Sequence, residues 1–164
     1  MEKNRNHIGT AISFMQDVAN EMNARFSHGS ITGIDNSSML VYPYIHINIG
    51  SVSVDKQTAQ IQINIVVGDR VNTIVNDNAG INEGTLYTQY GYTENNNYGF
   101  VLQEMYVRFV MAIQKYEQLY FNELQIQRPF DMQSFIEEYD DVTAGYVVTL
   151  NLTCINPLVD NQAC

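Results

Sequence analysis

The 164-residue chain carries 18 acidic and 8 basic side chains, a formal net charge of −10. Its length is that of a single domain, and a hydrophobic content of 45% is enough for a packed core. The basic residues are scattered from Lys3 to Arg128 without forming a run, which argues against binding nucleic acid through its phosphates. No stretch approaches 18 apolar residues, so we expect no membrane span and a fold that forms in the cytosol.

Only 16% of the residues are charged, and Asn and Gln occupy many of the remaining polar positions. Such a surface is easily desolvated, which favours broad contacts with other proteins. The two cysteines, Cys154 and Cys164, lack the close spacing of a zinc site or a disulfide framework. We therefore interpret Cys154 as a small core residue.

The first half of the chain reads as a helix followed by two strands. Apolar residues at three- and four-residue steps predict a helix over residues 7–27, with Asn6 as its N-cap and Gly29 just beyond its end. Alternating apolar and polar residues predict strands over residues 40–49 and 58–67. A turn between them favours an antiparallel hairpin with one apolar and one amide-rich face.

The second half begins with a long segment, residues 68–97, that shows no period and is expected to be a functional loop. A second amphipathic helix is predicted over residues 98–124. An aromatic and acidic segment, residues 130–141, then leads into a turn at Thr143-Ala144-Gly145 and a final strand over residues 145–155. This order predicts an α+β fold with two helices packed on one face of a mainly antiparallel sheet, in a single domain spanning residues 1–164.

The sequence contains none of the common nucleotide-binding, zinc-protease or hydrolase motifs. The one cluster of titratable groups is acidic and comprises Asp131, Glu137, Glu138, Asp140 and Asp141. Five carboxylates could hold Ca²⁺ or Mg²⁺, but their spacing matches no EF-hand loop. We favour a solvated acidic segment that completes a subunit contact, and we expect no catalytic residue, metal or cofactor.

The tyrosines are the second notable feature, because eleven are present without a single tryptophan. Tyrosine is enriched in protein interfaces, where its ring is buried and its hydroxyl stays hydrogen-bonded. The candidate subunit-interface residues are Arg70, Tyr87, Tyr90, Tyr92, Asp131, Tyr139, Asp140 and Asp141.

The stretch Asp140 to Leu152, DDVTAGYVVTLNL, resembles the C-terminal strand of tail-terminator and head-to-tail connector proteins of tailed bacteriophages. In that family an aromatic and acidic segment is followed by a small-residue turn, an aromatic residue and an alternating strand. The order of elements is also similar, and the Asn- and Tyr-rich, acidic composition resembles proteins of Bacteroidetes phages, including the crAss-like group. The long 68–97 segment and the C-terminal Asn-Pro-Leu tail depart from the family.

The resemblance implies a tail-terminator-like fold and a structural virion protein. Such proteins form six-fold or twelve-fold rings with themselves, contact neighbouring neck or tail proteins, and surround a channel through which DNA passes without specific binding. Two other interpretations stay open from the residues alone. One is a small cytosolic enzyme or ligand-binding domain that binds metal through residues 131–141, and the other is an adaptor that binds a partner without forming a ring.

Overall fold

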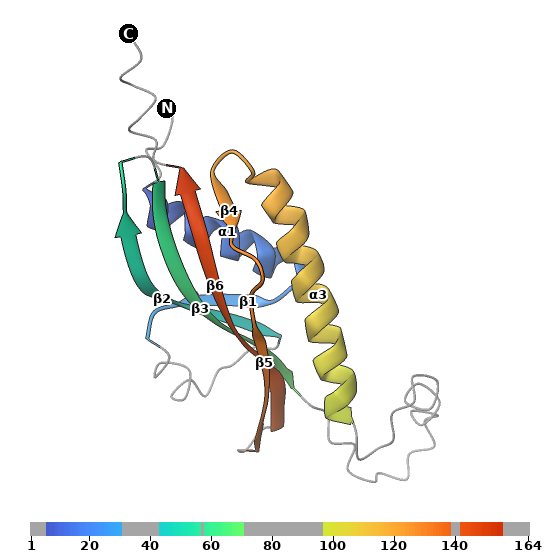
Figure 1. The fold of residues 1–164 in the computed structure, drawn as a ribbon. Helices are drawn as coiled ribbons and strands as arrows, with labels where there is room; N and C mark the ends of the chain where they lie inside the picture. The colour runs from blue at the N-terminus through green and yellow to red at the C-terminus, as the bar shows by residue number, and fades with distance from the viewer. Residues whose placement is uncertain (1–5, 31–42, 57, 71–96, 139–141, 156–164) are drawn as a thin grey trace, which may run out of the picture.

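The computed structural model describes residues 6–30, 43–56, 58–70, 97–138 and 142–155. In this part of the chain two helices contact one six-stranded, mostly antiparallel mixed sheet (Figure 1), which confirms the predicted α+β class. The elements are α1 (His7–Glu21), β1 (Arg25–His28), β2 (Tyr44–Val54), β3 (Thr58–Arg70), α3 (Asn97–Leu119), β4 (Leu124–Ile126), β5 (Met132–Glu138) and β6 (Val142–Ile155). The strand order is β1-β2-β3-β6-β4, and β5 pairs with β6 on the same side as β4. Neither described helix is long and apolar enough to cross a membrane.

Both helices cover the same face of the sheet. The odd-numbered residues of β3 from Ala59 to Val67 are buried, as are the even-numbered residues of β6 from Ala144 to Cys154 except for the half-buried Tyr146. The register places these two sets on one face, where α1 and α3 both contact β3. The helices also contact each other, and the ring of Phe14 on α1 packs edge to face against Tyr120, the residue that follows α3, with centroids 5.6 Å apart. The opposite face, which we call the open face, has no helix over it in the described part of the chain.

Helix α1 begins as predicted but ends six residues early. The side chain of Asn6 accepts a hydrogen bond from the Gly9 N–H, which confirms the predicted N-cap. The helix stops at Glu21 because Asn23 adopts a left-handed conformation, with φ of 52°. The chain then runs as β1, parallel to β2, so residues 25–27 of the predicted helix are wrong. Phe26 lies four residues after Met22 and fits a helical stripe equally well, which is why the period alone did not reveal the strand.

The central hairpin is longer than predicted. Strand β2 continues five residues beyond 49 through a register shift between Ile49 and Val52, so most of the predicted turn is strand. Strand β3 continues to Arg70, and the predicted loop 68–97 therefore begins three residues too early. The antiparallel pairing of the two strands is confirmed. Residues 40–42 and 71–96 lie outside the described part of the chain.

The region after α3 contains two strands that the sequence did not predict. Helix α3 begins at Asn97 and ends at Leu119, five residues before the predicted end. A turn follows, and the three residues of β4 pair with the end of β6. Most of the segment 130–141 is strand β5, which pairs with the first half of β6 and was not predicted as a strand.

The predicted turn at Thr143-Ala144-Gly145 is also wrong, because these residues belong to β6 and pair with β3. Gly145 lies opposite Gly68, and a Cβ atom at Gly145 would stand only 1.9 Å from the carbonyl oxygen of Val67. The glycine therefore marks a close approach of two backbones within a sheet. The ring of Tyr44 covers Gly68, and Phe135 lies opposite Gly145 in the register.

Gly145→Ala is expected to lower the free energy of unfolding by about 3 kcal/mol or more, because a backbone carbonyl cannot yield as a side chain can. Urea unfolding followed by circular dichroism measures the change. Gly50→Ala is the matched control, since its Cβ would meet the flexible ends of Gln62 and Asn64 at 3.0 and 3.1 Å and the Gln62 carbonyl oxygen only at an ordinary 3.5 Å, so it should cost less than about 1 kcal/mol. Equal effects of the two substitutions would contradict this account of Gly145.

The core lies between the helices and the covered face of the sheet and includes Cys154, which is 1% exposed. This confirms its predicted role as a core residue. Burial, with a smaller contribution from the nearby Glu123 charge, raises the pKa of the Cys154 thiol from 9.0 to about 11. Its reactive thiolate form is therefore about a hundred-fold scarcer at neutral pH than that of an exposed cysteine.

In a Cys164→Ser variant, where Cys154 is the only thiol, labelling by a thiol reagent at pH 8 is expected to be slow. Its rate should follow the opening of the fold and rise through the urea unfolding transition. The measurement is the rate of colour release from an aromatic disulfide reagent. Labelling of the folded protein as fast as that of the urea-unfolded chain would show that β6 is not packed as described.

Candidate interaction surfaces

The central part of the open face is an uncharged surface of amides and hydroxyls, and the exposed apolar residues Val147 and Ile155 lie on the same face. Its central positions lie on β2, β3, β4 and β6, and they alternate along each strand with residues of the core. The side chains at these positions are Asn48, Gln60, Gln62, Asn64, Gln125, Thr149, Asn151 and Thr153. They are exposed or half-buried, and the Thr149 hydroxyl donates to the Asn64 side-chain oxygen over 3.4 Å. Most of their donors and acceptors point away from the core and can bond to water or to another molecule.

His46 lies on β2 beside this face and has a structural role there. It is 5% exposed, and its Nε2 atom lies 3.2 Å from the carbonyl oxygen of Gly29, which can only accept. Nε2 therefore carries a proton, and Nδ1 is left to pair with the Ser27 hydroxyl at 2.8 Å. These bonds fasten β1 to β2, and they use both ring nitrogens of the histidine.

A second uncharged surface runs along α3 on the side that points away from the core. Val107, Met111, Gln114 and Gln118 follow one another at steps of four, three and four residues, opposite the buried stripe that contains Met105. Val107 is 41% and Met111 64% exposed, and both glutamines are exposed. We call these four residues the outer face of α3.

The charged residues that flank the outer face of α3 are paired within the chain. Arg108 contacts Glu104 at 3.1 Å on the same helix, and Lys115 contacts Glu21 of α1 at 2.7 Å. The Glu21 carboxylate is the main cause of the raised pKa of Lys115. The outer face was missed by the sequence analysis, although its spacing is visible as a second, sparser stripe between these charges.

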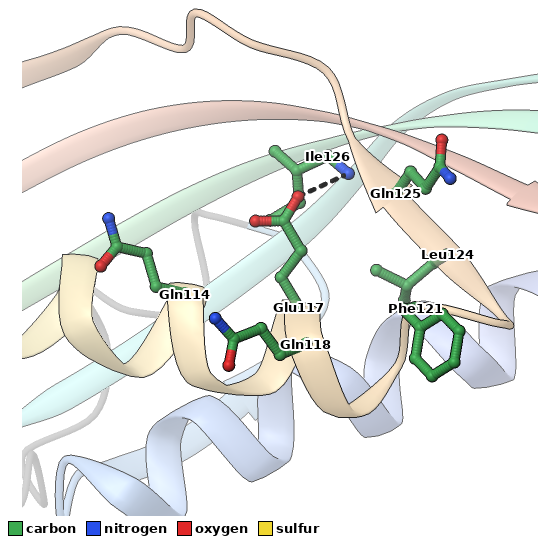
Figure 2. A pocket seen from close by; sticks show the side chains of 7 residues that line it. All are labelled: Gln114, Glu117, Gln118, Phe121, Leu124, Gln125 and Ile126. Atoms are coloured by element: carbon green, nitrogen blue, oxygen red, sulfur yellow. Dashed lines mark hydrogen bonds between the residues drawn. The ribbon is translucent and has the colours of Figure 1, made fainter.

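A shallow hollow of about 440 Å³ lies where the end of α3 meets β4 (Figure 2). It is lined by Gln114, Glu117, Gln118, Phe121, Leu124, Gln125 and Ile126. The one carboxylate among them is that of Glu117. It accepts a hydrogen bond from the Ile126 N–H at 3.4 Å and forms an ion pair with Arg128 at 2.6 Å. Both of its oxygens are thus engaged in holding β4 against the helix, which is a structural use of the charge.

Glu117→Ala is expected to lower the free energy of unfolding by about 1–2 kcal/mol, because the Ile126 N–H and the Arg128 guanidinium lose their acceptor. Thermal and urea unfolding measure the loss. Gln118→Ala removes an exposed neighbour and should change stability by less than about 0.5 kcal/mol. A Glu117→Ala protein as stable as the control would leave the ion pair without a role in the fold.

The predicted interface residues are mostly not placed by the structure. Arg70 ends β3, with its backbone opposite Thr143, and its side chain is not among those described. Asp131 is exposed immediately before β5. The other six lie outside the described residues: Tyr87, Tyr90, Tyr92, Tyr139, Asp140 and Asp141.

Only part of the acidic cluster lies among the residues that the structure describes. Glu137 and Glu138 lie within β5, while Asp140 and Asp141 fall in the undescribed link to β6. Within the residues that the structure describes, no three His, Cys, Asp or Glu side chains are grouped so that they could hold a metal ion.

Comparison with known proteins adds no family to this picture. No protein-family model matches the sequence, and no curated protein matches it.

Proposed function

We propose that this chain is a structural protein of a tailed-bacteriophage virion. In this proposal it is a tail terminator or head-to-tail connector whose copies form a six-fold or twelve-fold ring around the DNA channel. The observation that carries the proposal is a sheet with one face packed against helices and an opposite face whose central part is uncharged and exposed or half-buried. On a chain with a net charge of −10, such a face is suited to burial against another protein.

The order of the elements supports the same assignment. The resemblance to tail-terminator and connector proteins rests on a helix, a hairpin, a second helix and a final alternating strand. In the structure these are α1, the β2–β3 hairpin, α3 and β6, with three short strands added at the two sides of the sheet. Residues 142–152 of the resembling stretch lie on β6, which pairs with β3 from Thr143 to Ile155.

The charge of the chain fits a ring that DNA passes through. Because each copy carries eighteen acidic side chains and eight basic ones, its net negative charge repels the phosphates of DNA. A channel lined in this way lets DNA slide without binding it. Neighbouring neck or tail proteins would then be the partners above and below the ring.

The test is the mass of the purified protein in solution, measured by light scattering over a range of concentration. The expected result is a discrete species of six or twelve times 18.7 kDa, with a central hole in negatively stained electron micrographs. A mass of 18.7 kDa at every concentration up to millimolar would contradict the proposal.

A further inference from the structure

We propose that the subunit contact of this ring is formed by the outer face of α3 in one copy and the open face of the sheet in the next. The inference rests on the proposed function for the existence of a ring, and it adds which two surfaces meet. The partner that covers each of these two surfaces is therefore a second copy of the same chain, which binds through the other surface.

The first argument is electrostatic. Two copies with a net charge of −10 repel each other, so a stable contact has to be made where acidic side chains are absent. The outer face of α3 and the central open face are two such surfaces in the described chain. The charges beside the helix are already neutralised by Glu104–Arg108 and Glu21–Lys115, so burying the helix face leaves no unpaired ion.

The second argument is chemical fit. Val107 and Met111 supply exposed apolar area, while Gln114 and Gln118 supply amide donors and acceptors. The open face offers amides and hydroxyls in rows that a glutamine can bond to, such as Gln62, Asn64 and Asn151. Amides that lose water in an interface need such partners, and amide groups on both sides can satisfy one another.

The third argument is direction. The outer face of α3 lies on the side of the helix opposite its buried stripe. The open face lies on the side of the sheet that no described helix covers (Figure 1). A contact between them is heterologous, so after the first contact one copy keeps a free open face and the other keeps a free outer face of α3. Repetition of such a contact closes a ring when the rotation between copies divides a full turn.

The test uses Met111→Glu and Asn151→Glu, which place a buried negative charge in one surface each. Both positions are exposed, so the folded chain tolerates them, as circular dichroism and thermal unfolding verify. Gln16→Glu is the matched control, because it adds the same charge at an exposed site on α1. Each variant is measured alone and in an equimolar mixture of the two by light scattering and analytical ultracentrifugation.

Met111→Glu alone and Asn151→Glu alone are each expected to lose the oligomer, with association weakened at least about 100-fold, while Gln16→Glu assembles like the unmodified protein. The mixture is expected to form a one-to-one dimer of twice 18.7 kDa that grows no further. Only the intact helix face of Asn151→Glu and the intact sheet face of Met111→Glu can still meet.

Other outcomes overturn the contact in recognisable ways. A dimer of Asn151→Glu alone would indicate helix against helix, and a dimer of Met111→Glu alone would indicate sheet against sheet. Variants that assemble like the unmodified protein, or a mixture without the dimer, would overturn the contact while the ring itself stands. An unmodified chain that stays monomeric throughout would contradict the ring and the contact together.

Discussion

The pairing of β3 with β6 is the constraint on which the rest of the molecule depends. The register runs without a break from Thr58 opposite Ile155 to Arg70 opposite Thr143. Strand β2 attaches to one side of this pair, β4 and β5 attach to the other, and both helices pack across its covered face. Near one end the two backbones approach so closely that only glycine fits at position 145. A side chain there would separate the strands at the point where Tyr44 and Phe135 flank the glycine pair.

Because the helices bury one face only, the alternation along β3 and β6 produces two different surfaces. The isoleucines and leucines that point inward give up contact with water, and their burial provides the main stabilising free energy. In the central part of the pair the residues between them are Gln, Asn and Thr, which are neutral and exposed or half-buried. A sheet made in this way folds without its second face, and that face stays available for a contact made after folding.

The edge of the sheet at β4 is less available for a new contact than the open face is. The Leu124 N–H donates to the Tyr120 carbonyl and the Ile126 N–H to the Glu117 carboxylate, so outward-pointing donors of β4 are bonded within the chain. Covering an edge in this way hinders growth of the sheet by addition of a further strand. On this side of the molecule, another chain is therefore more easily bound at a face of the sheet than at the β4 edge.

Regular periodicity made most of the fold predictable from the sequence. The apolar stripes of α1 and α3 and the alternation in β3 and β6 each persist over about nine residues or more, the alternation in β2 runs from Ile45 to Ile49, and all of these elements are present. The failures occurred where local signals were short or ambiguous. Strand β4 has three residues, too few to show a period, and Phe26 continues a helical spacing although it lies in β1. Gly145 was interpreted as a turn residue because a close backbone approach cannot be distinguished from a turn without the partner strand.

The candidate surfaces were predictable to a smaller extent, for a physical reason. The amide-rich side of the strands follows from alternation, so it could be inferred before the sheet was seen. The outer face of α3 could not, because two exposed apolar residues among glutamines resemble an ordinary solvent-facing helix until the neighbouring charges are seen to be paired. Whether a surface can be desolvated depends on those pairs, and Glu21 reaches Lys115 only because the fold brings α1 beside α3.

Charge and assembly are thereby linked within a single copy. The acidic excess keeps individual copies apart at random orientations, since most approaches bring like charges together. An approach that matches two neutral surfaces avoids this repulsion, and the same excess then selects one orientation over the others. In the proposed ring the acidic side chains would lie outside the contacts, where water and salt would screen them from one another. A surplus of negative charge is thus compatible with tight assembly, provided that the contacts lie on surfaces that carry amides and no acidic side chains.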